Sequence, residues 1–332
     1  MTLIIAEAGV NHNGDIRLAK ELIDIASEAG ADIVKFQIFK AEELVTKKAK
    51  KAEYQLKSKS DSFDQYSMLK KLELTHREFE ELKDYSDSKS IEFLSTAFNI
   101  ENLEFLIKLK VKRIKIPSGE ITNLPYLEKA SSFGLPIILS TGISTMGEIR
   151  DAVDILLKNG VRKNQICILH CTTEYPAPID SVNLSAMKTI ANKIDTDVGY
   201  SDHTTNFEVP IAAVAMGAKV IEKHFTKSRE LEGPDHMASL EPRELSEMIS
   251  SIRNTEILIG TSEKNPAHEE LKNLNVIRKS IVAKKPIKKG EILDESNLTT
   301  KRPGDGISPM KWYELIGTIA TKSFNKDDLI EK

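Results

Sequence analysis

The feature that most limits the fold is an alternation of short apolar, β-like runs with segments of helical periodicity along the first three quarters of the chain. Short apolar runs separated by helical segments are typical of the buried strands of α/β proteins. Successive runs begin about 21 to 31 residues apart, except that the third follows the second after a longer interval. They lie at 3–9, 33–39, 92–98, 113–120, 136–142, 166–171, 197–203 and 220–226.

Two of the intervening segments carry clear helix signals. In 144–160, Thr145 and Glu148 have the spacing of a capping box, and Gly160 suits the end of the helix. In 241–260, Pro242 stands where proline is favoured, at the first position of a helix. The alternation therefore consists of strand and helix in turn.

Eight strand–helix units in about 260 residues predict an α/β fold of the (β/α)₈ TIM-barrel type. A doubly wound parallel sheet is the alternative, but the first strand lacks the G-x-G-x-x-G turn of a dinucleotide site. We expect the barrel domain to cover 1–262. The extra segment 40–75, rich in Lys, Ser and Gln, predicts an inserted loop or extended helix at the barrel mouth.

After the barrel the pattern changes. Residues 263–279 are polar and lack a strand pattern, which indicates a linker. Residues 280–332 contain short β-like pieces interrupted by Pro, Gly and Lys, and predict a small separate β module. A unit of about 50 residues is marginally stable alone, so we expect it to lean on another surface.

Composition excludes several classes of protein. Forty-seven Lys and Arg against 50 Asp and Glu give a net charge of −3, which offers no reason to expect nucleic acid or an anionic membrane as partner. No stretch approaches 18 consecutive apolar residues, and the N-terminus runs directly into a strand, so we expect neither a membrane span nor a signal peptide. Cys167 and Cys171 fit reduced core thiols, and the predicted location is cytoplasmic.

Reactive side chains gather at the C-terminal ends of the predicted strands, where barrels of this type build their active sites. One such residue is usually a surface or capping group, but here every strand contributes. The candidates on strands one to six are Glu7, Lys35, Thr96, Lys115, Ser118, Glu120, Ser140, Thr173 and Tyr175, and those on strands seven and eight are Ser201, His203 and His224.

Lys35 and Lys115 each lie between apolar neighbours in a strand. Because side chains alternate along a strand, both lysines point into the barrel if their neighbours pack against helices. A buried lysine without a partner is costly, so we expect an anion beside them, with phosphate and carboxylate as the natural groups. The alternative is that the lysines reach solvent or pair with Glu7 and Glu120.

His203 and His224 end the adjacent strands seven and eight, so their rings can converge on one divalent ion. Two histidines with open coordination positions suit Mn²⁺, Fe²⁺ or Zn²⁺. Asp235 follows in a tight Gly-Pro-Asp-His loop near the same mouth. Arg302 lies in a glycine-containing turn of the C-terminal module. This turn is either an ordinary surface turn or a loop that extends into the mouth of a barrel.

These motifs together resemble the sialic acid synthase family along nearly the whole chain. They are Ile5-Ala6-Glu7 with Asn11-His12-Asn13-Gly14, 34–37, 115–120, 140–142, 201–204, 222–226 and 301–304. The resemblance implies a TIM barrel followed by a C-terminal SAF domain, similar to type III antifreeze protein. It also implies a transferase that condenses phosphoenolpyruvate with an N-acetylated mannosamine-type sugar and releases phosphate.

Carried over to this sequence, the resemblance assigns roles to individual residues. Lys35, Thr96, Lys115, Ser118, Ser140 and Ser201 would hold phosphoenolpyruvate, and His203 and His224 would bind Mn²⁺ or Mg²⁺. Glu7, Tyr175 and Asp235 would contact the sugar. In family homodimers the C-terminal domain of one subunit covers the barrel mouth of the other, so Arg302 would bind the N-acetyl group there. Thr173 stands where sialic acid synthases often carry Asn.

The expected chemistry is attack of phosphoenolpyruvate on the open-chain aldehyde, with the metal as Lewis acid. Glu120 is the first candidate for the base that activates water, and Glu7 is the alternative. The expected substrate is N-acetylmannosamine, giving N-acetylneuraminate. Four segments resemble legionaminic acid synthases at least as much, and those enzymes use 2,4-diacetamido-2,4,6-trideoxymannose. The segments are 2–15, 119–129, 170–178 and 197–204. More distant alternatives are a Schiff-base aldolase using Lys35 or Lys115, and a sugar- or ice-binding module.

Overall fold

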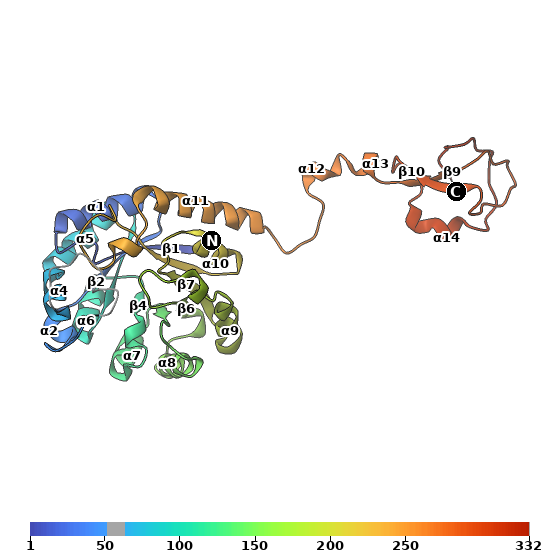
Figure 1. The fold of residues 1–332 in the computed structure, drawn as a ribbon. Coiled ribbons are helices and arrows are strands. Elements are labelled where there is room, and N and C mark those ends of the chain that lie inside the picture. Colours follow the sequence, from blue (N-terminus) through green and yellow to red (C-terminus); the bar gives the residue numbers. More distant parts are fainter. Residues whose placement is uncertain (52–63, 332) are drawn as a thin grey trace. The chain divides into compact units, whose positions relative to one another are not determined.

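The computed structural model describes residues 1–51 and 64–331, and its larger unit is a closed barrel of parallel strands surrounded by helices (Figure 1). The strands follow one another in chain order, and β8 pairs with β1 to close the ring. The predicted (β/α)₈ fold is confirmed. The strands are β1 Leu3–Gly9, β2 Ile33–Ile38, β3 Glu92–Ala97, β4 Ile114–Ile116, β5 Ile137–Ser140, β6 Ile166–Cys171, β7 Asp197–Asp202 and β8 Val220–His224.

Side-chain alternation along these strands sorts the residues into two faces. Val34 and Phe36 of β2 belong to the core between strands and helices, as do Ile114 and Ile116 of β4. The opposite face of the strands carries a small apolar cluster inside the barrel. That inner cluster has as its buried members Ile5, Ile33, Leu94, Ile138, Leu169 and Val220.

The residues two positions further along the same strands face the same interior one layer closer to the mouth. They are Glu7, Lys35, Thr96, Ser140, Cys171 and Glu222. An apolar layer therefore closes the barrel beneath a layer of polar and ionisable groups. This arrangement positions the candidate site.

The helices that cover the outside of the barrel present buried apolar faces to the strands. As predicted, α8 has a capping box formed by Thr145 and Glu148, and α11 begins at Pro242. Strand β4 is shorter than predicted because Pro117 has no N–H with which to continue the ladder. The helices are α1 Ile16–Glu28, α5 His76–Ser88, α6 Ile100–Lys108, α7 Leu124–Ser131, α8 Met146–Lys158, α9 Ser185–Ile194, α10 Glu208–Ala215 and α11 Pro242–Ile259.

In the described part of the inserted segment 40–75 lie two short helices, α2 Ala41–Leu44 and α4 Gln65–Lys71. Residues 52–63 of the predicted insertion lie outside the described residues. Met68 and Leu72 of this segment are buried in a cluster with Val10 and Phe39, which follow β1 and β2. The described part of the insertion is therefore packed onto the barrel rim.

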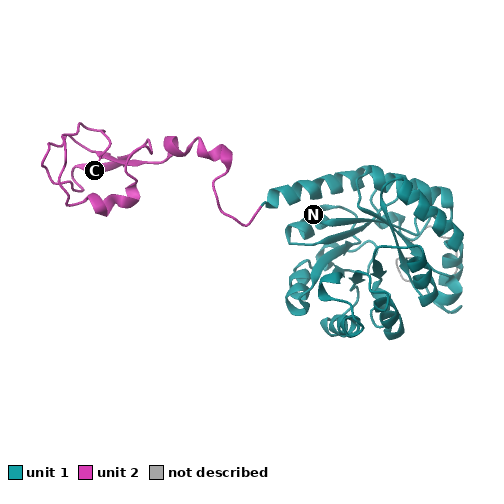
Figure 2. Cartoon of the chain, turned by 180° about the vertical axis from the view of Figure 1, so that it is seen from behind, with its two compact units in different colours: residues 1–260 teal, residues 261–332 magenta. Residues whose placement is uncertain are grey.

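The second compact unit covers Thr261–Lys332, and the first covers Met1–Gly260 (Figure 2). The first part of the second unit, expected to be a linker, contains the short helices α12 His268–Leu271 and α13 Leu274–Ile277. The module that follows has an antiparallel pair, β9 Ser280–Ala283 and β10 Leu298–Lys301, and a short helix, α14 Trp312–Leu315. It has an apolar core of its own, which includes Ile281, Leu298 and Phe324.

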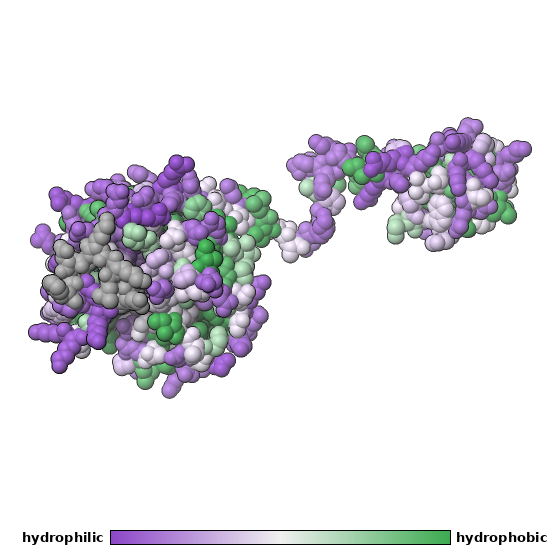
Figure 3. All heavy atoms as spheres, viewed as in Figure 1, coloured by the Kyte–Doolittle hydropathy of each residue, from purple (hydrophilic) through white to green (hydrophobic). Residues whose placement is uncertain are grey.

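The visible face of the chain is largely hydrophilic, with smaller apolar areas (Figure 3). One apolar group, at the end of α11, consists of the exposed side chains Ile257, Leu258 and Ile259. Among the described residues, none of the helices combines the length and the apolar character needed to cross a membrane.

Candidate active site

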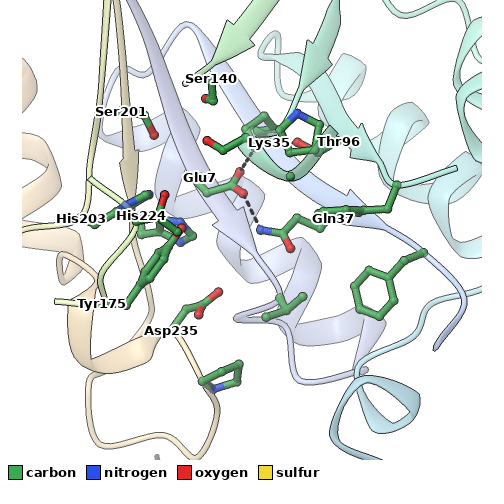
Figure 4. Close-up of a pocket in the computed structure, with 18 of the residues that line it drawn as sticks. Glu7, Lys35, Gln37, Thr96, Ser140, Tyr175, Ser201, His203, His224 and Asp235 are labelled. Carbon is green, nitrogen blue, oxygen red and sulfur yellow. Dashed lines mark hydrogen bonds and ion pairs between the residues drawn. The ribbon is translucent and has the colours of Figure 1, made fainter. Parts of the chain in front are cut away.

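A cavity of about 340 Å³ opens at the C-terminal ends of the strands. Twelve of the fourteen site residues predicted from the sequence line it, and Figure 4 shows ten of its lining side chains by label. The twelve are Glu7, Lys35, Thr96, Lys115, Ser118, Ser140, Thr173, Tyr175, Ser201, His203, His224 and Asp235. The predicted mouth of the barrel is thus the place where these side chains converge.

The floor of the cavity is a network of two lysines and two carboxylates, all almost completely buried. Lys35 Nζ lies 2.8 Å from Glu7 Oε2 and 3.6 Å from Glu222 Oε2, and it donates a hydrogen bond of 2.9 Å to Thr96 Oγ1. Lys115 Nζ lies 3.1 Å from Glu222 Oε1. Glu222 therefore bridges the two lysines, and Glu7 contacts only Lys35 of the pair in this network.

The two carboxyl groups differ in their protonation behaviour. Burial raises the pKa of Glu7, and the charge of Glu222 adds to this effect, although Lys35 opposes both. Burial also acts to raise the pKa of Glu222, but Lys115 and Lys35 outweigh it and hold the pKa at about 2. Glu222 is therefore a permanent carboxylate at neutral pH, whereas Glu7 is the group that exchanges a proton more easily.

The lysines respond in opposite directions to the same surroundings. Burial lowers the pKa of Lys115, and the single strong contact with Glu222 does not compensate for it. Burial acts on Lys35 in the same way, but Glu222 and Glu7 together raise its pKa above the ordinary value. Lys35 is thus the more firmly charged of the two.

Glu222 is the residue of this floor to which the sequence analysis assigned no role. The alternative that the lysines pair with Glu7 and Glu120 is correct for Glu7 and wrong for Glu120, because Glu222 takes the second position. The alternation that singled out Lys35 and Lys115 is weaker at Glu222, because only one of its neighbours, Ile221, is apolar and the other is Lys223, although Glu222 also lines the cavity.

Glu120 and Arg302 are the two predicted site residues that do not line the cavity. Glu120 lies in a short 3₁₀ turn after β4, Ser118–Glu120, where its Oε2 accepts a hydrogen bond of 2.5 Å from Asn123 Nδ2. The turn follows Pro117, and it directs the Glu120 side chain towards Asn123, the residue that precedes α7. Arg302 belongs to the second unit, where its Nε donates to the Ile277 carbonyl at 2.9 Å.

Several hydroxyl groups around the floor are available to a ligand. Ser140 Oγ and Thr173 Oγ1 are buried and have no hydrogen-bond partner. Ser118 Oγ accepts a hydrogen bond of 2.8 Å from the Gly142 amide and lies 3.5 Å from Cys171 Sγ. A Cβ at Gly142 would lie 1.9 Å from Thr173 Oγ1, so only glycine allows this close approach.

The two histidines form one side of the cavity, with ring centroids 5.5 Å apart. His203 Nδ1 lies 2.6 Å from the Thr172 carbonyl, which can only accept, so Nδ1 carries the proton and the lone pair is on Nε2. His224 Nδ1 is buried and has no hydrogen-bond partner. Burial lowers the pKa of His203 to about 4 and that of His224 well below its ordinary value.

Neutral imidazoles with free lone pairs are the form that binds metal ions. Among the described residues, no group of three or more His, Cys, Asp or Glu side chains is arranged to hold a metal. His203 and His224 are the two residues that could supply nitrogen ligands to a divalent ion, with its further positions left to water or substrate.

A second buried ion pair lies directly behind the histidines. Lys223 Nζ contacts Asp202 Oδ2 at 2.5 Å and donates to the carbonyls of Thr204 and Asn206. Asp202 in turn accepts hydrogen bonds from the amide and hydroxyl of Thr204. Since Asp202 and Lys223 each precede a histidine in the chain, this network holds the loop after β7 beside β8 and with it the position of His203.

Tyr175 lies beside the two histidines, and Asp235 lies next to Tyr175 (Figure 4). The Tyr175 ring stacks on His203 with 4.0 Å between centroids and meets His224 edge-on. Burial, assisted by the charge of Glu7, raises the pKa of Asp235 to about 7. Both residues can therefore offer hydrogen bonds to a polar ligand that lies above the floor.

A further side of the cavity, built on β1, β2 and β3, is apolar. Three of its residues, Val10, Phe39 and Phe98, follow β1, β2 and β3, and the others come from the inserted segment. We refer to this surface as the apolar wall, and it consists of Val10, Phe39, Leu44, Val45, Met68, Leu69, Leu72 and Phe98. The cavity thus combines a charged floor, a histidine side and an apolar side.

The family model "NeuB family" matches residues 22–264, and the "SAF domain" model matches 278–332. This chain belongs to the NeuB family. It is 53% identical over 331 residues to N,N'-diacetyllegionaminic acid synthase of Campylobacter jejuni, covering 100% of this chain and 99% of that protein. It is 48% identical to the enzyme of the same name from Legionella pneumophila, covering 95% and 89%.

A solved structure agrees with this assignment. The N-acetylneuraminic acid synthetase of Leptospira borgpetersenii, in complex with citrate, matches with a TM-score of 0.74 and 36% identity, covering 82% of this chain and 90% of that one. The predicted resemblance to the sialic acid synthases, including the legionaminic acid synthases, and the predicted SAF domain are confirmed. As a NeuB-family protein, the chain is an enzyme of the nonulosonic acid synthase class.

Proposed function

We propose that this NeuB-family enzyme condenses phosphoenolpyruvate with 2,4-diacetamido-2,4,6-trideoxymannose and water, giving N,N'-diacetyllegionaminic acid and phosphate. The main support for this reaction type is the buried floor, where Lys35 and Lys115 line the same cavity as two hydroxyl groups without a hydrogen-bond partner. These are Ser140 Oγ and Thr173 Oγ1. The relatives at 53% and 48% identity favour the diacetamido sugar. N-acetylmannosamine is the second candidate, because the Leptospira enzyme is named for N-acetylneuraminic acid.

In this proposal phosphoenolpyruvate lies on the floor. Lys35 and Lys115 attract its phosphate and carboxylate, and Ser140 and Thr173 donate hydrogen bonds to their oxygens. The two lysines are already paired with two carboxylates, so an anion adds negative charge to the network. Glu7, with its raised pKa, is the group that takes up a proton to compensate.

The sugar lies above phosphoenolpyruvate, with its open-chain aldehyde towards the histidines. A divalent metal, Mn²⁺ or Mg²⁺, held by His203 and His224 would polarise the aldehyde as a Lewis acid. Tyr175 and Asp235 orient the rest of the polar chain by hydrogen bonds. Lys223 and Asp202 act behind them and keep the two imidazoles in place.

The bond changes follow from these positions. The C3 carbon of phosphoenolpyruvate attacks the aldehyde carbon, and the aldehyde oxygen takes the proton of neutral Glu7. Water then adds to the cationic C2 carbon and gives its proton to the Glu7 carboxylate. The C2–oxygen bond to phosphate then breaks while the C2 hydroxyl group gives its proton to the departing phosphate and becomes the ketone, and the lysines stabilise the phosphate as it leaves. Glu120 has no part in this scheme because it lies outside the cavity.

Arg302 is the residue through which the second unit would contact the sugar. We propose a homodimer in which the C-terminal domain of one subunit covers the barrel mouth of its partner, and Arg302 binds the sugar N-acetyl group there. Arg302→Ala should then raise KM for the sugar. Mixing this variant with a Lys115→Ala variant should restore part of the activity, because one mouth in each mixed dimer contains both intact residues. No restoration contradicts a shared site.

The experiment that tests the function measures phosphate release from phosphoenolpyruvate with each sugar, with and without Mn²⁺. We expect release that requires the sugar, a higher kcat/KM for the diacetamido sugar, and loss of activity after metal removal. Activity that is unchanged in metal-stripped buffer contradicts the metal role. Trapping of a covalent adduct by borohydride with pyruvate would instead support the Schiff-base aldolase, because a metal-dependent synthase forms no imine.

A further inference from the structure

The apolar wall is an unusual surface for a sugar site, because a sugar with many hydroxyl groups has little apolar surface to pack against it. Leu44 and Leu69 are only half buried, so part of their surface faces the cavity. Water or a hydroxyl group against this surface makes no hydrogen bond with it, whereas an apolar group would remove it from water. The wall therefore favours a ligand that carries an apolar group on one side.

The wall is held in place by contacts among the described residues themselves. The Ala41 amide, at the start of α2, donates a hydrogen bond of 2.7 Å to Glu73, just after α4. Phe39 and Phe98 meet edge to face with 6.1 Å between centroids. A Cβ at Gly14 would lie 2.4 Å from the carbonyl oxygen of Lys71, so the loop after β1 packs directly on the end of α4.

Strand order places the wall relative to the reacting groups. The wall rises from β1, β2 and β3, and His203 and His224 stand at the ends of β7 and β8. Because β8 pairs with β1, the wall begins beside His224 and runs away from it towards β3. On β1 and β2, Glu7 and Lys35 lie deeper than the wall residues that follow them in the chain. A sugar whose aldehyde is at the histidines and whose length crosses the cavity above the floor therefore ends at the wall.

We infer that the apolar wall selects the sugar at its far end by packing against a C6 methyl group, with Leu44 and Leu69 as specificity-determining residues. This inference rests on the proposed condensation reaction and adds a structural reason for a 6-deoxy substrate. A C6 hydroxyl group against Leu44 and Leu69 would lose its water without gaining a partner from either leucine. Gln65, the first residue of α4, also lines the cavity and leaves a polar position beside the wall.

The test compares two sugars that differ only at C6, N-acetylmannosamine and its 6-deoxy counterpart. An apolar pocket discriminates against an added hydroxyl group by about 100-fold at most. We expect the parent enzyme to favour the 6-deoxy sugar in kcat/KM by about 10- to 100-fold. Leu69→Gln and Leu44→Gln should each reduce this preference by about 10-fold, because a carboxamide can bond the hydroxyl group, and should leave KM for phosphoenolpyruvate unchanged.

The matched control is Leu124→Gln, an exposed leucine at the start of α7 that does not line the cavity, and we expect it to keep the parent preference. Leu44 and Leu69 lie on different helices, so one variant still reports if the other fails to fold. Equal kcat/KM for the two sugars in the parent enzyme, or an unchanged ratio in a folded wall variant, overturns the inference while the condensation reaction stands. Absence of phosphate release with every sugar overturns the proposed function itself.

Discussion

Glu222→Gln is a substitution for which the structure predicts a large and well-defined loss of stability. The change preserves side-chain volume but removes the carboxylate that bridges Lys115 and Lys35 at 3.1 and 3.6 Å. The pKa of about 2 lies below the ordinary 4.5, and at about 1.36 kcal/mol per pKa unit the difference corresponds to about 3 kcal/mol. Breaking a buried pair from one side typically costs about 3–5 kcal/mol, which agrees.

Urea unfolding at pH 7, followed by far-UV circular dichroism, measures this cost for the barrel. We expect the free energy of unfolding to fall by about 3 kcal/mol. The single tryptophan, Trp312, packs against the core of the second unit, so its fluorescence should report an unchanged transition. The matched control is Glu21→Gln, because Glu21 pairs with Lys227 at 2.6 Å on the surface and should contribute less than about 1 kcal/mol.

The pH dependence gives a second check with a definite sign. Because the folded pKa of Glu222 is depressed, its stabilisation is complete above the ordinary pKa of 4.5 and is lost as the pH falls through about 2. The difference between parent and variant should therefore shrink as the pH is lowered across this window. A loss below about 1 kcal/mol at pH 7, or a difference that does not change with pH, would refute the reasoning about the floor.

Three further substitutions separate the roles of the other groups. Glu7→Gln should lower kcat about 100-fold or more whereas Glu120→Gln should not, and equal effects in the phosphate-release assay would contradict the choice of base. Lys223→Met should weaken Mn²⁺ binding about 10- to 100-fold by calorimetry, in protein whose circular dichroism matches the parent, and unchanged affinity would remove its positioning role. Burial raises the pKa of Asp235 in the folded protein from 3.8 to about 7, so the parent enzyme loses stability as the pH rises between these values. Asp235→Asn should therefore be more stable than the parent by up to about 4 kcal/mol above pH 7 and equally stable below pH 3.8. A gain in the free energy of unfolding at low pH would contradict this.

Much of the fold could be predicted because it rests on local periodicity. Alternation of two along the strands and 3.6 along the helices decides which side of each element is apolar, and neither depends on distant residues. The same alternation predicted that Lys35 and Lys115 point inward, and both line the cavity. The bounds of β1 and β6 agree with the apolar runs to the residue.

The prediction for Glu120 was wrong because a short local turn decided the direction of its side chain. Glu120 follows a strand end and looks like its neighbours in the sequence, but Pro117 ends β4 and starts a turn that bonds Glu120 to Asn123. The helices α12 and α13 within 263–279 have four residues each, which is too short to show a period, so no sequence pattern indicated them. Periodicity cannot register features shorter than one or two turns.

By itself, the sequence determined which residues face the barrel interior, because the side-chain period of a strand is a property of the local backbone. Only the tertiary structure decided which of these residues become partners. Glu222 and Lys115 are 107 positions apart, and closure of the ring brings β8 beside β1, where Glu7 lies opposite His224. A charge has no fixed partner until the chain closes around it, and the pKa values of the floor depend on that closure.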